Sequence, residues 1–586
     1  MNRKYITIII IILMLPLAGL RAQLSGMESA LEEAFQKSKI VEYVVVFKER
    51  ADFSKSLPLK TKNEKAAFVY HSLVEKATFS QREVLTYLAL KNIPHQSFYI
   101  TNAIKVTSSV EDALWIMNRP EVAWLFYNNA IKMLDYIEEK EIVQSRDVEP
   151  EWGIKMIKAD SVWAMGYSGE GVVIGGQDTG YAWDVNPLKI KYRGYIDSSD
   201  VNHNYSWHDA IHKNSPNFPD SLLNPCGYSI LTPCDDQNHG THTMGTMVGE
   251  DLENKIGVAP NAKWIGCRNM DRGWGSPSTY MECFEWLLAP YDLSGENADP
   301  SKAPHVINNS WYCSEQEGCS LSNFYLMNEI VNNLKASGIV VVVSAGNSGR
   351  ECSTITGPPA IFENSFTIGA TTDADTIARY SSRGLVTIDS SFRMKPNVSA
   401  PGSRVKSVIA NGEFANFSGT SMAGPHVAGL VALMISANPE LAGKVDEIEE
   451  MIESTADKKT WEQDCNDVSG SSFPNAVFGW GRVNALEAVK RALAFSSNVS
   501  IADANASLQV FPNPTSDEIT LYFKGENEVF YSLLIRNVAG QKIVENNNFN
   551  NDKISVVYLS NFPKGMYYYE VRSESGKTYT GKITKI

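Results

Sequence analysis

The stretch Asn416-Phe417-Ser418-Gly419-Thr420-Ser421-Met422-Ala423-Gly424-Pro425-His426-Val427-Ala428-Gly429 leads directly into the apolar residues 430–435. Its small residues predict a turn, and the apolar run predicts a buried helix with Ser421 at its first position. A serine there presents its hydroxyl beside a helix N-terminus, which stabilises an anion. An ordinary N-cap serine has the same pattern, so other segments must decide between a reactive site and a cap.

The chain is long and mildly acidic. It has 586 residues, of which 43% are hydrophobic and 20% charged, and its formal net charge is −14. Single hydrophobic cores stop growing well below this length, so we expect about three or four units. Nucleic acid is not an expected partner, because a phosphate backbone requires a basic face.

The first 22 residues have the composition of a secretory signal peptide. Asn2-Arg3-Lys4 is basic, residues 6–20 are apolar, and Ala22 provides a small residue before the expected cleavage point. An uncleaved anchor is the alternative, but the apolar run is short for a membrane span. We therefore expect export.

An exported chain with eight cysteines is expected to form disulfides. Cys226 with Cys234, and Cys313 with Cys319, are close enough in sequence to clip local loops. The other four suggest no particular pairing: Cys267, Cys283, Cys352 and Cys465. A zinc cluster is not expected, because the sequence has no CxxC spacing.

Residues 41–127 read as a small unit of their own. Strand-like residues 41–47 precede a helical pattern over 66–90, two strands flank the turn Thr101-Asn102, and a helix over 110–117 precedes a strand over 122–127. This β-α-β-β-α-β order predicts a split βαβ sandwich. Its place between a signal peptide and a larger domain suggests a pro-segment, with proteolytic processing somewhere in the polar stretch 128–150.

Two segments upstream of Ser421 carry polar residues at the ends of regular elements. Residues 172–176 predict a buried strand followed by Asp178, at the position where α/β sheets place their sites. Residues 235–249 predict a small-residue helix that begins at His239. Asp178 alone can be a turn cap, and His239 with His242 has an i, i+3 spacing that can suggest a metal pair. No third ligand is evident, so a single histidine base fits better.

The third segment is the apolar run 339–343, which predicts a fully buried parallel strand. Asn347 follows it in a turn between glycines. Its amide can donate a hydrogen bond to an oxyanion, although an asparagine can also serve only to shape the turn.

Asp178, His239 and Ser421 follow one another in the subtilisin-type order. The chain resembles the subtilase family of serine peptidases in four motifs: Asp178-Thr179-Gly180, His239-Gly240-Thr241-His242, Ser344-Ala345-Gly346-Asn347 and the stretch 419–426. The resemblance covers about 150–495. Three stretches resemble the bacillopeptidase F group in particular: 176–181, 267–271 and 306–311. Residues 41–127 are similar to the inhibitory pro-segment of the family.

The resemblance implies roles for the polar residues. His239 is expected to take the proton of Ser421 and return it to the leaving amine, while Asp178 holds the imidazole. Asn347 and the Ser421 N–H are expected to hold the oxyanion. The implied substrate-binding residues are Ser310, Trp311, Tyr312, Gly346, Gly357, Gly273, Trp274 and Gly275. Tyr312 stands where the family usually has glycine, so the size of the S1 pocket is open.

The resemblance implies no cofactor for the chemistry. Relatives often bind structural calcium, and the acids of 184–236 are either its ligands or ordinary surface charge, so the expectation of calcium comes without a site.

A Ser/Asn/Ala-rich linker precedes a new unit that begins at Leu508. Alternating residues predict strands over 518–522, 532–536, 553–557, 566–571 and 581–586, which together predict a small β-sandwich. On its Phe511-Pro512-Asn513-Pro514 start and its basic last strand, this unit resembles the C-terminal sorting domain of type IX secretion. A generic adhesion or carbohydrate-binding module is the alternative.

The sequence thus predicts an α/β protein with a subtilisin-like parallel-sheet catalytic domain. The expected parts are a signal peptide (1–22), an inhibitory pro-segment (23–148), the catalytic domain (149–495), a linker (496–507) and the sorting β-sandwich (508–586). The expected function is a secreted serine endopeptidase made as a zymogen and routed across the outer membrane. Its partners would be protein or peptide substrates, its own pro-segment and the secretion machinery. The alternative is a non-catalytic cell-surface binding protein on a subtilase fold.

Overall fold

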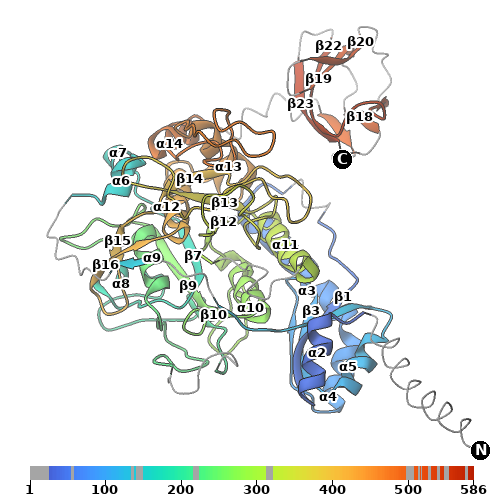
Figure 1. The fold of residues 1–586 in the computed structure, drawn as a ribbon, viewed down its shortest axis with the longest axis vertical. Coiled ribbons are helices and arrows are strands. Elements are labelled where there is room, and N and C mark those ends of the chain that lie inside the picture. Colours follow the sequence, from blue (N-terminus) through green and yellow to red (C-terminus); the bar gives the residue numbers. More distant parts are fainter. Residues whose placement is uncertain are drawn as a thin grey trace, which may run out of the picture. The chain divides into compact units, whose positions relative to one another are not determined.

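A computed structural model gives the fold (Figure 1). It describes residues 26–585 except 54–58, 133–136, 140–148, 215–223, 312–320, 496–506, 512–514, 516–517, 525–529, 538–540, 547–553 and 574–577. The expected signal peptide, Tyr312, Cys313 and Cys319 lie outside the described residues. The chain forms two compact units, Met1–Ala494 and Phe495–Ile586, which are described separately.

The first unit is organised around a seven-stranded parallel sheet, as the sequence predicts. The strand order is β14-β13-β12-β11-β7-β9-β8. Its strands are β7 (Val173–Asp178), β8 (Trp207–Asp209), β9 (Lys263–Arg268), β11 (Val306–Asn309), β12 (Val340–Ser344), β13 (Phe366–Thr371) and β14 (Val398–Pro401). The strand order reverses between β7 and β11, which is where open α/β sheets bind ligands.

Helices cover both faces of this sheet. On one face lie α9 (His239–Val248) and α12 (Thr420–Ala437), which pack on each other, and on the other lie α10 (Pro277–Leu288) and α11 (Leu321–Ala336) (Figure 1). Among the described residues, α12 is the one helix long and apolar enough to cross a membrane, but 89% of it is buried in the unit. It is therefore a core helix. The unit is closed by α13 (Val445–Thr455) and α14 (Ala485–Ala494).

The predicted β-α-β-β-α-β order of residues 41–127 is confirmed. Its sheet is antiparallel, in the order β2-β3-β1-β4. The elements are β1 (Val41–Phe47), α3 (Lys62–Ser80), α4 (Arg82–Leu90), β2 (His95–Phe98), β3 (Ala103–Ser108), α5 (Val110–Met117) and β4 (Val122–Tyr127), preceded by α2 (Ser29–Lys37). The expected single helix 66–90 is two helices that meet at Gln81, whose buried amide donates to Phe98 O at 3.0 Å.

Three disulfides lie in the described part of the chain. Cys226–Cys234 is the local clip that the sequence predicts. Cys267–Cys283 joins β9 to α10, and Cys352–Cys465 joins segments 113 residues apart. Neither of the last two pairings could be chosen from spacing alone.

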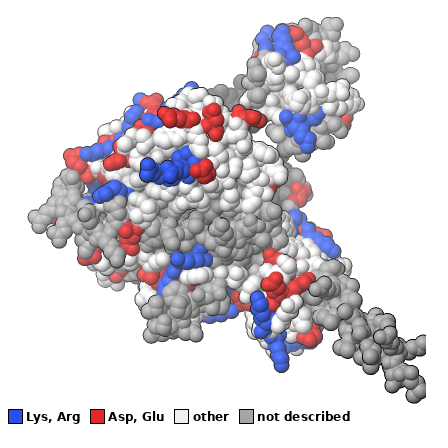
Figure 2. All heavy atoms as spheres, viewed as in Figure 1, with Lys and Arg blue, Asp and Glu red and all other residues white. Residues whose placement is uncertain are grey.

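The second unit is a small β-sandwich of two antiparallel sheets, as expected. One sheet has the order β17-β18-β21 and the other β20-β19-β22-β23. The strands are β17 (Ser507–Phe511), β18 (Glu518–Lys524), β19 (Phe530–Asn537), β20 (Lys542–Asn546), β21 (Ile554–Tyr558), β22 (Gly565–Ser573) and β23 (Thr578–Lys585). β17 and β20 were not predicted as strands. On the face shown in Figure 2, acidic and basic side chains are interspersed among the described residues.

Candidate active site

Asp178 and His239 form a buried pair at the carboxyl edge of the sheet. Asp178 is the last residue of β7, and His239 is the first residue of α9. Asp178 Oδ1 lies 2.7 Å from His239 Nδ1 and accepts the Thr179 N–H at 2.8 Å. Both side chains are fully buried. The carboxylate therefore fixes Nδ1 of the imidazole, and Nε2 lies on the opposite side of the ring.

Asp235 is a supporting residue that the sequence did not single out. Its Oδ1 accepts the Thr179 hydroxyl at 2.8 Å, and its Oδ2 accepts the Thr241 N–H at 2.8 Å. Thr179 follows Asp178, and Thr241 lies in the first turn of α9. Asp235 thus ties the loop after β7 to the helix that begins with His239. The local signal was an acidic residue just before a predicted helix start.

Ser421 lies in the first turn of α12, as the second helical residue and not the first as expected. Gly419 is the N-cap and Thr420 begins the helix. The Ser421 hydroxyl donates to Ser310 O at 3.1 Å, and the Ser310 hydroxyl donates to Ser421 O at 2.8 Å. α12 packs on α9, the helix that begins with His239.

Asn347 lies in the turn after β12 and faces the start of α12. Its Oδ1 accepts the Thr420 N–H at 2.9 Å and the Thr420 hydroxyl at 3.0 Å. Both bonds use the oxygen of the amide. The orientation leaves the Nδ2 donor for another acceptor beside the N-terminus of α12, where an anion is favoured.

The expected substrate-binding strand is paired with the chain itself. β10 (Trp274–Gly275) pairs antiparallel with β5 (Ile131–Lys132). Gly273, just before β10, has φ +83°, and a Cβ there would lie 2.7 Å from Gln237 Oε1. A second pairing lies just before Ser421, where β16 (Phe414–Ser418) pairs antiparallel with β6 (Ile137–Glu139).

The other expected pocket residues have different surroundings. The Trp311 ring is 2% exposed and stacks on Tyr280, with ring centroids 4.0 Å apart, so its side chain belongs to the core below α10. The Gly346 N–H donates to the Thr420 hydroxyl at 3.2 Å, close to Asn347. Gly357 is buried in the loop between β12 and β13.

His242 points away from His239. Its Nε2 lies 3.1 Å from both Val405 O and Ala415 O, and its ring stacks on Phe417. Burial lowers its pKa to about 3, so it is neutral. Among the described residues, no group of three or more His, Cys, Asp or Glu side chains is placed to hold a metal ion. We therefore assign no calcium site.

The small N-terminal domain contacts α10 and α11 through three glutamates, of which Glu282 is buried and Glu285 and Glu329 are partly buried. Glu285 Oε2 accepts the N–H groups of Tyr99 and Ile100 at 2.6 and 3.0 Å. Glu329 Oε2 accepts the Thr101 hydroxyl at 3.0 Å, and Glu282 Oε2 accepts the Gln96 amide at 2.8 Å. Burial raises the pKa of Glu285 to about 8 and that of Glu329 to about 7.

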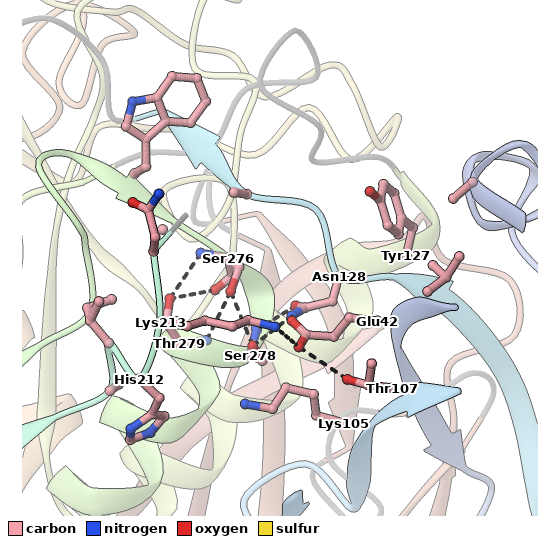
Figure 3. Close-up of a pocket in the computed structure, with 18 of the residues that line it drawn as sticks. Glu42, Lys105, Thr107, Tyr127, Asn128, His212, Lys213, Ser276, Ser278 and Thr279 are labelled. Atoms are coloured by element: carbon pink, nitrogen blue, oxygen red, sulfur yellow. Dashed lines mark hydrogen bonds and ion pairs between the residues drawn. The ribbon is translucent and has the colours of Figure 1, made fainter. Parts of the chain in front are cut away.

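A cavity of about 520 Å³ lies where this domain meets the start of α10 (Figure 3). Glu42 of β1 bridges its two walls, because it accepts from Lys213 at 2.5 Å and from Asn128 at 2.7 Å. Asn128 in turn accepts the Ser278 N–H at 3.1 Å. The cavity borders β10 and is not the site of the Asp178–His239 pair.

A buried Asp–His pair after β7 and a serine in the first turn of α12 place side chains of the kinds used in nucleophilic catalysis on a parallel α/β sheet with helices on both faces. Residues 169–481, more than half of the chain, match the model of the Subtilase family, and the chain belongs to this family. Residues 509–585 match the model of the secretion system C-terminal sorting domain. This match indicates type IX secretion to the cell surface or the extracellular space.

The chain is similar to several named relatives. It is 32% identical to bacillopeptidase F of Bacillus subtilis (strain 168) over 82% of this chain and 33% of that protein, so it spans about a third of this relative's length. It is 30% identical to subtilisin E of the same strain over 55% of this chain and 70% of that protein. It is 32% identical to the thermophilic serine proteinase of Bacillus sp. (strain AK1) over 53% of this chain and 65% of that protein.

Proposed function

We propose that the chain is a secreted serine endopeptidase that hydrolyses peptide bonds through an acyl-enzyme on Ser421. His239 accepts the hydroxyl proton as Ser421 attacks and gives it to the leaving amine, while Asp178 holds the imidazole in the required tautomer. The Ser421 N–H and the Asn347 Nδ2 donate to the oxyanion. The 2.7 Å contact between two fully buried Asp178 and His239 side chains carries this proposal. The chemistry needs no cofactor.

The substrate is proposed to be an extended peptide that adds a strand to β10. The chain itself supports this, because β5 occupies that edge and β6 occupies the edge of β16 just before Ser421. Residues 133–136 connect the two pairings. We propose that the processing bond lies in this connection, which narrows the predicted interval of 128–150.

Residues 23–148 are proposed to be the inhibitory pro-segment, with the processing bond inside its C-terminal part. Its folded domain is held on α10 and α11 by the glutamate contacts of Glu282, Glu285 and Glu329, while β5 covers the edge that a substrate would use. A substrate would therefore compete with the segment for β10. Residues 149–495 would be the catalytic domain, 496–507 the linker and 508–586 the sorting domain that the secretion machinery recognises.

The test compares the full chain with its Ser421→Ala variant. We expect the wild type to be cut within 133–136, seen by mass spectrometry, and to react with a fluorophosphonate probe at Ser421 once the cut N-terminal domain has been removed. The variant should remain whole and unlabelled with an unchanged circular dichroism spectrum. A folded wild-type chain that is neither cut nor labelled, even after the N-terminal domain has been removed by an added peptidase, would contradict the proposal and favour a binding protein.

A further inference from the structure

Three buried amide side chains near the proposed site have no part in the mechanism above. Gln177, Asn269 and Asn309 lie in the three stretches that resemble the bacillopeptidase F group, and each has 0% exposure. Burial of an amide is costly unless its hydrogen bonds are made. Their partners therefore show what these residues hold together.

The three amides form one chain of hydrogen bonds across the sheet. The Asn269 amide donates to Gln177 Oε1 at 2.9 Å, and the Gln177 amide donates to Asn309 Oδ1 at 2.7 Å. The Asn309 amide then donates to Val342 O at 3.0 Å. Because β9, β7, β11 and β12 are neighbours in the sheet, this amide relay connects four adjacent strands.

The amide relay lies where main-chain pairing stops. β7 and β11 pair from Val306–Ile174 to Asn308–Gly176, and Gln177 and Asn309 are the next residues on each strand. This is also the switch point, beyond which the strands separate to leave room for a ligand. The Gln177–Asn309 bond thus fixes the separation of β7 and β11 at the point where their backbones no longer do so.

The amide relay lies on the opposite face of the sheet from the reacting groups. A Cβ on Gly175 would contact Leu287 of α10, whereas one on Gly176 would contact Met244 of α9. Because side chains alternate along a strand, Gln177 lies on the α10 side and Asp178 on the α9 side. The amides cannot touch a substrate at Ser421, so any effect on catalysis acts through position.

One end of the amide relay bonds to Asp178, and the two residues that flank Asn309 on β11 lead to Ser421. The Asn269 N–H donates to Asp178 O at 3.0 Å. On β11, the Asn308 amide donates to the Ser310 hydroxyl at 2.8 Å, and that hydroxyl donates to Ser421 O at 2.8 Å. The end of β11 therefore connects the strand of Asp178 with the helix of Ser421.

We propose that Gln177, Asn269 and Asn309 are positioning residues that set the distance between the Asp178–His239 pair and Ser421. The inference rests on the proposed peptidase activity. Gln177 and Asn309 each use both the oxygen and the nitrogen of the amide, so a shift of either strand leaves a buried polar group without its partner. A displacement of about 1 Å at a reacting group costs about a hundredfold in rate. The amides would therefore act mainly on kcat and little on KM.

The test uses the full chain with Gln177→Met, Asn309→Leu and both changes together, which keep the side-chain volume but remove the amide. Thr367→Val is the matched control. Thr367 is also fully buried, in β13, and its hydroxyl donates to Ala360 O at 2.7 Å, so the change removes one core hydrogen bond of the same sheet. Kinetics on a peptide anilide are measured per active site, counted by fluorophosphonate titration, beside thermal unfolding.

We expect each single variant to lower kcat about 10- to 100-fold with KM changed less than about threefold. The double variant should be no slower than the slower single variant, because both break the same connection. Thr367→Val should keep kcat within about twofold at a similar loss of thermal stability. If Gln177→Met does not fold, Asn269→Ala, which removes only the outer bond, should still lower the rate of fluorophosphonate labelling.

Two results would overturn the inference. If the wild type turns over while the amide variants keep its kcat, or lose no more of it than Thr367→Val does at equal stability, the amides only stabilise the core. If the two single effects on kcat multiply in the double variant, Gln177 and Asn309 do not act as one unit. A wild type that neither labels nor cleaves would overturn the proposed function itself, and the positioning role with it.

Discussion

Replacing Glu285 with leucine should release the proposed pro-segment. Glu285 Oε2 is the acceptor for two main-chain N–H groups, those of Tyr99 at 2.6 Å and Ile100 at 3.0 Å. A buried donor left without its acceptor costs about 1–3 kcal/mol, so the two together cost about 2–6 kcal/mol in the complex. These donors regain water when the domain dissociates. A tenfold change in the dissociation constant corresponds to about 1.4 kcal/mol. The middle of this range, about 4 kcal/mol, therefore raises the dissociation constant of the complex about a thousandfold.

The assay dilutes the processed complex and follows the appearance of peptidase activity, with native mass spectrometry to count the bound pro-segment. Glu285→Gln is the matched control, because its amide oxygen can still accept both N–H groups. We expect the leucine variant to become active at far higher protein concentration than the wild type, and the glutamine variant to stay close to the wild type. Equal dissociation constants for the leucine variant and the wild type would refute the reasoning.

Three further predictions concern the active site, the folded state and pH. Asn347→Leu should lower kcat by about 10²- to 10³-fold with KM little changed, the range found for loss of one oxyanion donor in subtilisin, a relative. Removing the Cys352–Cys465 disulfide, which links residues 113 positions apart, should lower the free energy of unfolding by about 2–5 kcal/mol. Urea unfolding of the Ser421→Ala variant with and without the disulfide would measure this. Burial raises the pKa of Glu285 to about 8 and lowers that of Lys62, which donates to Ala303 O, to about 7. Association therefore takes up a proton at Glu285 below about pH 8, so affinity falls as the pH rises toward 8. It releases a proton at Lys62 above about pH 7, so affinity rises again at higher pH. The affinity of the proposed pro-segment should therefore be weakest between about pH 7 and 8, which titration calorimetry on the Ser421→Ala variant would measure.

The elements that carry His239, Asn347 and Ser421 could be predicted because each is marked by a local pattern. The apolar run of β12 and the small-residue helix starts of α9 and α12 are visible within windows of about ten to fifteen residues. The alternation of apolar and polar residues, which is also a short-range pattern, indicated the C-terminal strands from 518 onward. Ser421 differs from its expected place by a single position, since Thr420 begins the helix, and helix starts are the least sharply marked part of such patterns.

The supporting contacts could not be predicted, because they join residues that only the fold brings together. Asp235 is 56 residues from Thr179, and Asn309 is 132 residues from Gln177. Nothing in the composition of either stretch indicates its partner. The Cys352–Cys465 pairing has the same origin, since four cysteines without a local partner allow several connectivities.

The distribution of contacts explains how a cut pro-segment can remain bound. The pairings at the site are short, with β5 contributing two residues and β6 three, and both adjoin the proposed processing bond. The bonds to Glu282, Glu285 and Glu329 come from residues 96–101, more than 30 residues before that bond. Cleavage in 133–136 would free the ends of β5 and β6 but leave every glutamate contact in place. We therefore expect that hydrolysis of the proposed processing bond does not suffice for activity, and that a second event must break the glutamate contacts.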